Sequence, residues 1–447
     1  MANYVLLIGL IIITLISIYI FKDIFAPASL VCESFLLAFI CACFSSSMGG
    51  WKFALHYSTV FIILIGLWFF FIGSFLAKCQ KNKRPEKRYI AIINPPLNKL
   101  ITLLIIQVIL LIIYIYYYRI AISQFGLMDW GNMIRAYRFA GSYGEGLQFP
   151  IPDWVNQLIK FSRANGYVAL YILIHNFTIH KYLNRKVPHL LILSLIFILY
   201  LPYNLLNAAR FELIVILSMG LVIWYTYYRQ SANIIGEQQF NIKKAIGKIA
   251  VIILISFIGF SAIAPLVGRT QSEGIITQTM DYLGRSLQAF DNYVERPNLE
   301  SNKSNIETFY NVAKFLKQIH IVDDDVEKIH MEFTSQNGYS LGNTYTAFRR
   351  YYADLDIIGV LLFSTLGGYI LSFAYIKTKY PVFGKIDYKF QCYTAVIFSA
   401  FLYCFDDYIF ASIISFNYLL IFVFLYLVCK WINGELEISG SKLSLKL

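Results

Sequence analysis

The sequence predicts an all-α polytopic membrane protein with about eleven transmembrane helices and a long external loop that contains amphipathic helices. Hydrophobic residues make up 58% of the 447 residues and charged residues only 14%, with a mean hydropathy of +0.59. This composition leaves too little polar surface for a soluble globule of this length. The apolar residues also gather in runs of about 20, which is the length that a helix needs to cross a bilayer.

Transmembrane spans are predicted wherever such a run lacks charge. The first run has no basic residue before it and no small-residue cleavage site after it, so it is expected to be a retained span and not a removed signal peptide. The predicted spans are Tyr4–Phe21, Leu30–Phe44, Ser58–Ala77, Leu100–Tyr118, Ala164–Ile179, Leu190–Leu206, Phe211–Tyr228, Ile249–Ala264, Ile357–Ile376, Cys392–Phe405 and Tyr408–Cys429.

Basic loops predict the orientation of these spans. The connection 78–99 is the most basic in the chain, so it is expected in the cytoplasm. Alternation from this loop places the short basic loops near 181–186, 229–248 and 377–389 on the same side, together with the C-terminal tail. The N-terminus then lies outside, in agreement with its lack of Lys and Arg.

This topology divides the chain into three segments. Residues 1–265 hold eight spans and an external loop at 119–163, residues 266–356 form a large external loop or cap, and residues 357–447 hold the last three spans and a cytoplasmic tail. In the large loop, apolar residues recur every three or four positions over Ile276–Phe290 and Ile306–Ile319. These two amphipathic helices are expected to lie on the membrane surface or to cap the bundle.

The net charge of +12 does not predict nucleic-acid binding, because basic residues are expected in the cytoplasmic loops of a membrane protein. The seven cysteines lie in or beside hydrophobic segments without a CxxC pair, so neither disulfides nor a zinc site is expected. Asp129, Glu145 and Asp153 are widely spaced in the first large external loop, which disfavours a divalent metal. No cofactor is predicted.

Arginines at the predicted external ends of spans are the main candidates for ligand binding. Arg210 lies between two spans, Arg269 follows the eighth, and Arg349 and Arg350 precede the ninth. Guanidinium groups stay protonated and bind phosphate oxygens with two N–H groups at once, without a metal. For Arg210 alone, an interfacial anchor that extends to the lipid headgroups explains the position equally well.

Three further arginines are candidates for the same ligand. Arg285 lies in the first amphipathic helix, where an ordinary surface pair with Asp281, four residues earlier, is the alternative explanation. Arg135 and Arg138 lie in the earlier external loop beside Tyr137, and they are secondary candidates for sugar or phosphate contact.

A large external loop above many spans suggests a transporter or an enzyme that acts on a lipid-borne substrate. Glycosyl transfer from a lipid diphosphate needs positive charge on the leaving group and a base for the attacking hydroxyl. Asp354 neighbours Arg349 and Arg350, although a carboxylate that begins the following helix is the alternative. Glu332 and His330 are the other candidate catalytic residues. The external acids and histidines that could supply the base are Asp281, Asp291, Glu332, Asp354, His320 and His330.

Short segments spread along the chain carry a family resemblance. They are Phe25-Ala26-Pro27-Ala28-Ser29, Arg210-Phe211-Glu212-Leu213, the run from Tyr282 through Arg285 to Tyr293, and the run from Gly342 through Asp354 to Gly359. In these segments the chain resembles the bacterial oligosaccharide repeat-unit polymerases, the Wzy-type enzymes of O-antigen and capsule. It departs from the family at Leu355-Asp356, where an aromatic residue and a glycine are more usual after the aspartate. A second acid there changes the charge environment of Asp354.

The resemblance implies a membrane glycosyltransferase of the glycosyltransferase-C fold in the bacterial inner membrane. It implies a metal-independent polymerase whose active site faces the periplasm under the long external loop. The substrate would be an undecaprenyl-pyrophosphate-linked oligosaccharide, and the growing glycan would move onto the non-reducing end of a new lipid-linked repeat unit. The lipid bilayer and a polysaccharide chain-length regulator are the partners that the resemblance implies.

Two other functions remain open at this stage. An O-antigen ligase would share the architecture but use lipid A core as its acceptor. A flippase for lipid-linked oligosaccharides would also be basic and polytopic, but it should carry charges at mid-membrane depth, short external loops and two related halves. The gathering of charges at the external boundary and the long loop favour an enzyme over a flippase.

Overall fold

The computed structural model describes residues 1–48, 50–80, 89–126, 129–143, 147–206, 211–236, 247, 275–296, 307–321, 331–439 and 442–445. They form two compact units. Unit 1 comprises Met1–Lys83, Glu273–Lys377 and Val396–Leu419, and unit 2 comprises Arg84–Ser272, Thr378–Ala395 and Leu420–Leu447. The units follow spatial contacts and interleave along the chain. The described parts of the large loop therefore belong with the first three helices and α12 (Phe348–Thr378), and not to a separate domain.

The described residues are mainly helical, as the sequence predicts. Their strands form only two short antiparallel pairs, β1 (Thr334–Gln336) with β2 (Tyr339–Gly342), and β3 (Leu436–Ser439) with β4 (Lys442–Leu445). Six helices are long and apolar enough to cross a membrane: α1 (Ala2–Phe21), α2 (Pro27–Ser47), α3 (Tyr57–Lys78), α4 (Leu97–Ser123), α8 (Phe211–Ile235) and α12. They correspond to the predicted first, second, third, fourth, seventh and ninth spans, and the protein is an all-α membrane protein.

The other predicted spans differ more from the structure. The fifth lies within α6 (Asp153–Leu183), whose first half is polar, and the sixth is the shorter apolar helix α7 (Leu190–Leu206). The eighth, 249–264, lies outside the described residues. The total of eleven spans therefore stays a prediction.

The two C-terminal spans are interrupted where single helices were predicted. The tenth is split into α13 (Tyr388–Val396) and the single turn α14 (Phe398–Phe401). The eleventh becomes a π-helical turn, Ile409–Ile413, followed by α15 (Phe416–Ile432). The Asp407 carboxylate accepts hydrogen bonds from the backbone N–H groups at 409, 410 and 411, and so begins a separate turn there.

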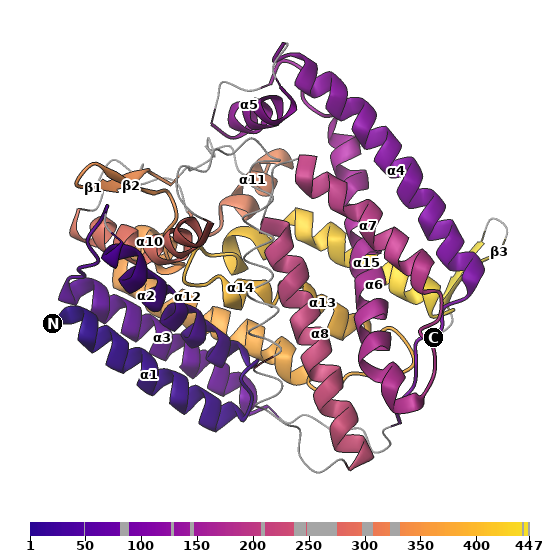
Figure 1. The fold of residues 1–447 in the computed structure, drawn as a ribbon, viewed down its shortest axis with the longest axis horizontal. Coiled ribbons are helices and arrows are strands. Elements are labelled where there is room, and N and C mark those ends of the chain that lie inside the picture. Colours follow the sequence, from indigo (N-terminus) through magenta and orange to yellow (C-terminus); the bar gives the residue numbers. More distant parts are fainter. Residues whose placement is uncertain are drawn as a thin grey trace. The chain divides into compact units, whose positions relative to one another are not determined.

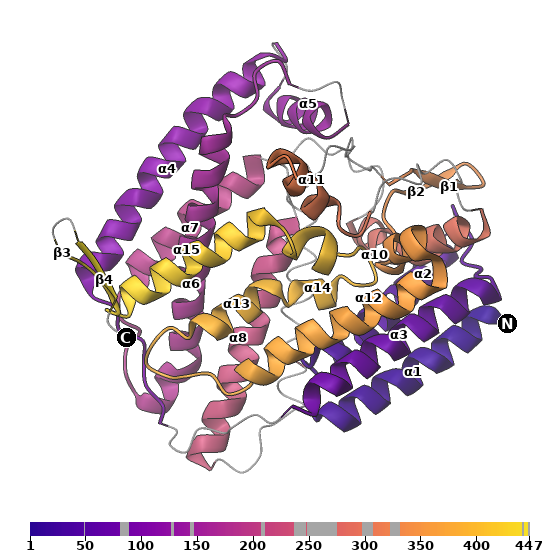
Figure 2. The same ribbon diagram turned by 180° about the vertical axis from the view of Figure 1, so that it is seen from behind.

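Unit 1 is built on α1, α2 and α3, which lie side by side in Figures 1 and 2. The α3 and α12 helices approach each other closely because glycine stands at the contact. A Cβ atom on Gly73 would lie 1.9 Å from the carbonyl oxygen of Thr365, and one on Gly368 would lie 2.1 Å from that of Phe70. Small residues of this kind let helix backbones meet in membranes, where no hydrophobic force drives them together.

The first predicted amphipathic helix is confirmed as α10 (Ile275–Glu295), and α11 (Tyr310–Gln318) lies within the second predicted segment. The α10 helix packs on the end of α2 and on the α2–α3 loop, so it caps the bundle. Its Asp281 accepts a hydrogen bond from Trp51, and its Asp291 contacts both the backbone and the ring of His56. Polar contacts therefore fasten the cap to the helix ends.

A β-hairpin that the sequence analysis did not predict packs against α10. The Asn337-Gly338 pair between β1 and β2 has positive φ at both residues, 52° and 78°. This is the backbone of a type I′ turn, for which Asn-Gly is the favoured sequence. The Asn337-Gly338 pair therefore could have predicted a hairpin inside the large loop.

Unit 2 contains α4, α5 (Trp130–Tyr143), α6, α7 and α8, together with α13 and most of α15. Its interior is rich in tyrosine, and the fully buried side chains include Tyr114, Tyr118, Tyr167, Tyr171, Tyr200, Tyr203 and Tyr227. The tyrosine hydroxyls need partners in such an interior. Tyr167 and Tyr200, for example, both donate to Glu212 at the start of α8.

A kink at Leu355 and Asp356 divides α12 into a short first helix and the predicted ninth span. Asp356 has φ 54° and ψ −145°, a conformation that L-residues rarely adopt and that glycine adopts freely. This is also the position at which the polymerases that the short motifs resemble more usually carry glycine. Asp356 is thus a strained backbone site.

We expect Asp356→Gly to raise the free energy of unfolding by about 1 kcal/mol. Relief of the strain is worth about 1–3 kcal/mol, and the greater freedom of glycine in the unfolded chain offsets about 0.5–1 kcal/mol of it. Comparison of thermal unfolding midpoints of the purified protein tests this. Asp356→Ala keeps the Cβ and removes only the carboxylate, so it should give no gain; equal stabilisation by both variants would show that the backbone is not strained.

Candidate functional site

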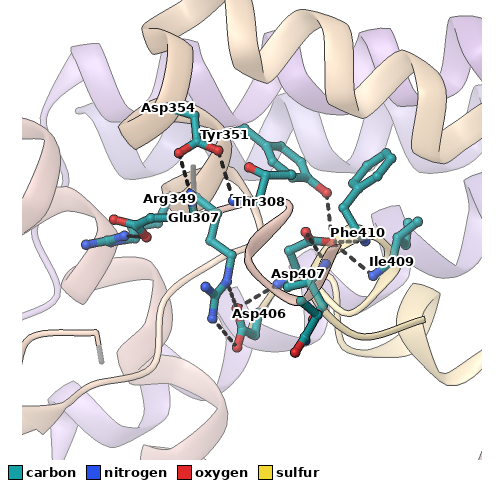
Figure 3. A network of polar contacts seen from close by, with 12 residues as sticks. Glu307, Thr308, Arg349, Tyr351, Asp354, Asp406, Asp407, Ile409 and Phe410 are labelled. Atoms are coloured by element: carbon teal, nitrogen blue, oxygen red, sulfur yellow. Dashed lines mark hydrogen bonds and ion pairs between the residues drawn. The ribbon is translucent and has the colours of Figure 1, made fainter. Parts of the chain in front are cut away.

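The candidate site is a buried network of charged side chains in unit 1 (Figure 3). It forms where the first turn of α12 meets three other pieces of chain: the residues before α11, the residue two positions before β1, and the turn that precedes the π-helix. Its ionisable members are Arg349, Arg350, Glu307, Glu332, Asp354, Asp406 and Asp407.

Arg349 is the more enclosed of the two arginines, at 2% exposed. Its guanidinium pairs with Glu307 through Nη1 and with Glu332 through Nη2, the latter at 2.8 Å. The same group lies over the rings of Tyr293, 4.5 Å from the centroid, and Tyr345, at 5.6 Å. Two carboxylates and two aromatic faces therefore surround this cation, which leaves it little capacity for a further anion.

Arg350 points to a different partner. Its Nε donates to Asp406 at 2.9 Å and its Nη2 to the other oxygen of the same carboxylate at 3.4 Å, a two-pronged pair. The next residue, Asp407, is 1% exposed and accepts hydrogen bonds from three backbone N–H groups and from the hydroxyl of Tyr351. The Asp406-Asp407 pair thus ties the first turn of α12 to the start of the π-helix.

The Asp354 carboxylate accepts hydrogen bonds from the backbone of the segment before α11. One of its oxygens accepts from the N–H of Glu307 at 2.8 Å, and the other accepts from the N–H of Thr308 at 2.9 Å. This anchors the segment that carries Glu307 and so presents Glu307 to Arg349. The contacts favour a positioning role for Asp354, in place of the general base that the sequence analysis considered.

Glu332 has the properties that a general base requires. Its side chain is 30% exposed, against 3% for Glu307, so it alone of the two partners of Arg349 can meet a substrate. Burial raises the pKa of Glu332, opposed by hydrogen bonds that favour the charged form. A raised pKa brings a carboxylate closer to the operating pH and makes it a better proton acceptor. Tyr345 donates to the Glu332 carbonyl at 2.9 Å and holds the residue in place.

The charge balance of the network does not fit a simple anion clamp. Five carboxylates share the network with two guanidiniums, and the ion pairs of both guanidiniums are to carboxylates. A diphosphate close to these acids would be repelled, so Arg349 and Arg350 are better suited to hold carboxylates in place. This differs from the role in phosphate binding that their sequence positions suggested.

Arg285 lies in a second polar cluster of unit 1. Its Nη2 donates to Asp281 and to the hydroxyl of Tyr339, and the guanidinium lies 4.8 Å from the centroid of that ring. The side chain is 23% exposed, more than Arg349 or Arg350. The Nε atom has no hydrogen-bond acceptor among the described residues. Arg349 also has an Nε without an acceptor, so the greater exposure of the Arg285 side chain is what distinguishes the two arginines.

The remaining candidates lie in unit 2, at the end of α11 in unit 1, and among the undescribed residues. Arg135 and Arg138 lie on α5 in unit 2, a helix that packs beside Tyr118 of α4 through Tyr137, at a ring separation of 5.4 Å. His320 follows α11 with a positive φ of 56°. Arg210, Arg269 and His330 lie outside the described residues, and their roles stay predictions.

Sequence reasoning missed several members of these clusters. Glu307 was not considered, because nothing in the local sequence links it to Arg349, 42 residues later. Asp406 and Asp407, which lie between the last two predicted spans, were not among the candidate site residues. In unit 2, Arg163 pairs with Glu212 at 2.6 Å, and Glu212 was quoted only as part of a motif. Arg163 and Glu212 could have been identified as candidates from the sequence, because each is a charged residue close to a predicted span.

Within the described ranges no group of three or more His, Cys, Asp or Glu side chains is placed to hold a metal ion. Comparisons of the chain with protein-family models, with curated proteins and with solved structures found no match. The functional assignment below therefore depends on the residues of this chain and on the short motifs in its sequence.

Proposed function

We propose that the protein is a glycosyltransferase that polymerises undecaprenyl-pyrophosphate-linked oligosaccharide repeat units into O-antigen or capsule polysaccharide. One observation carries the proposal: seven ionisable side chains form a mostly buried network in unit 1, in a membrane protein with only 14% charged residues. Charges so placed are costly to desolvate, and in membrane proteins they mark functional sites. The substrate class, a lipid-linked oligosaccharide, is proposed from the short sequence segments that resemble the repeat-unit polymerases.

The proposed reaction is metal-independent and uses the groups of unit 1. The acceptor hydroxyl transfers its proton to the Glu332 carboxylate as its oxygen attacks the anomeric carbon of the donor sugar. The bond from that carbon to the diphosphate oxygen breaks, and the leaving diphosphate keeps the electron pair. Arg349 holds Glu332 in position at 2.8 Å. Positioned bases of this kind contribute about 10²–10⁴-fold to rate.

The leaving diphosphate needs cations outside the acid-rich network. Arg285 is the described arginine of unit 1 best suited to it, because its side chain is 23% exposed, against 14% for Arg350 and 3% for Arg349. Arg210 and Arg269, which the sequence places at span ends, are proposed to complete the binding of the diphosphate. The site is proposed to face the periplasm from the bacterial inner membrane, with a chain-length regulator as a partner.

Deletion of the gene in its host tests this function by the banding of surface polysaccharide on a gel. We expect lipid A core with a single repeat unit and no ladder, or the corresponding loss of long capsule chains. Unmodified core with accumulated lipid-linked polymer would instead identify a ligase. Complete loss of repeat units would identify a flippase, and an unchanged ladder would reject all three functions.

A further inference from the structure

The α2 helix carries one charged residue, Glu33, within a segment that is long and apolar enough to cross the membrane. Glu33 lies six residues after Pro27, about 9 Å along the helix. A glutamate side chain is too short to extend from that depth to the headgroup region, unlike the long side chains of Lys and Arg. Placing an unpaired carboxylate inside the hydrocarbon costs about 2.5–3.5 kcal/mol.

Glu33 has no favourable partner among the described residues. The structure gives it neither a hydrogen bond nor an ion pair, and its one nearby charge is another carboxylate, Asp23, which repels it. Asp23 is itself engaged by the N–H of Phe25 and by the hydroxyl of Tyr375. Unit 1 therefore leaves the intramembrane acid without a compensating group.

The surroundings of Glu33 on α2 form an exposed apolar stripe. Leu37, Ile40 and Phe44 follow Glu33 at intervals of four, three and four residues, so all four share one face of the helix. Their exposed fractions are 42%, 55% and 44%, whereas the opposite face of α2 is buried against α1, α3 and α10. The stripe is about 16 Å long, which is about half of a bilayer core.

We propose that this stripe of α2, Glu33 with Leu37, Ile40 and Phe44, docks a transmembrane helix of a partner protein that carries a lysine or arginine at the depth of Glu33. Charge complementarity selects the partner, because an ion pair offsets the cost of both charges in the membrane. The apolar residues supply the packing that holds helices together in lipid. This inference is independent of the proposed enzymatic function, since no residue of the reaction lies on the stripe.

The test uses the full chain in lipid nanodiscs with a photo-crosslinking residue in place of Leu37. The probe is a biotinylated Leu/Ala membrane-spanning peptide with one lysine six residues from its end, and its counterpart has norleucine there. We expect about tenfold more adduct with the lysine peptide, the effect of about 1.4 kcal/mol. Glu33→Gln should reduce the adduct yield of the lysine peptide to that of the norleucine peptide. Glu33→Asp should keep most of the excess yield.

A photo-crosslinking residue at Ile112 provides the matched control, because Ile112 is 62% exposed on α4, a helix whose sequence contains no acidic residue. There the two peptides should give equal yields. The proposal is overturned if the peptides crosslink equally at Leu37, if Glu33→Gln leaves the preference intact, or if adducts form only between two copies of the chain. If a carboxyl-reactive carbodiimide labels Glu33 and the lysine peptide is not preferred in crosslinking, Glu33 is a protonated acid. That result would also overturn the proposal.

Discussion

Glu332→Gln is expected to reduce polysaccharide chain extension by at least about a hundredfold, while the protein still accumulates in the membrane. The amide keeps the size and the hydrogen bonding of the side chain but cannot accept the proton of the attacking hydroxyl, a step worth about 10²–10⁴-fold. The gel ladder in the complemented deletion strain measures the effect. In a reconstituted assay, the rate of polymer formation from lipid-linked repeat units gives its size.

The pH dependence of that rate gives a second measurement. A base acts only when it is deprotonated, so activity should fall as the pH drops through the pKa of Glu332. Because burial raises this pKa, the fall should occur above the usual pH range of a glutamate. Glu295→Gln is the matched control, since Glu295 is an exposed acid of α10 that bonds Ser58 outside the network. A full-length ladder from Glu332→Gln would contradict the assignment of the base.

Arg349→Ala is expected to lower the free energy of unfolding by about 3–5 kcal/mol, the usual cost of breaking a buried ion pair. The substitution leaves Glu307, which is 3% exposed, without its countercharge, and it also removes a partner of Glu332. Thermal unfolding of the purified protein can be followed with a thiol-reactive dye, because Cys32, Cys41, Cys404 and Cys429 are buried until the chain unfolds.

Removal of the acids together with the arginine separates charge from packing. The combination Arg349→Met, Glu307→Gln and Glu332→Gln should recover most of the lost stability, because no uncompensated charge stays buried. Lys385→Ala is the surface control. The ion pair of Lys385 with Glu435 has an N–O distance of 3.6 Å, and the Lys385 side chain is 58% exposed. Loss of this pair should therefore lower the free energy of unfolding by only about 0–1 kcal/mol. A loss below about 1 kcal/mol for Arg349→Ala would mean that the pair is not buried in solution.

Much of the fold was predictable because the signals for it are local. A run of apolar residues such as Tyr4–Phe21 can satisfy its backbone in a membrane only as a helix, whatever the rest of the chain does. The periodicity over Ile276–Phe290 likewise predicted α10. The failures were also local in origin: Asp407 begins a separate turn, and the Asn337-Gly338 turn was overlooked.

The candidate site was predictable only in part. Arg349 and Arg350 were selected because they lie beside a span, and the structure does place them in a polar network. Their partners could not be identified, because Glu307 and Asp406 lie 42 and 56 residues away from them in the chain. Asp354 looked like a base from its neighbours in sequence, yet its oxygens accept backbone hydrogen bonds from residues 307 and 308.

By itself, the sequence determined that this is an all-α membrane protein with amphipathic helices in its largest loop, because hydropathy and helical periodicity depend on neighbouring residues alone. Only the tertiary structure decided which charges meet. Desolvation and pairing depend on distance in space, so the difference between an enclosed Arg349, a more accessible Arg285 and an unpaired Glu33 appears only when the chain is folded.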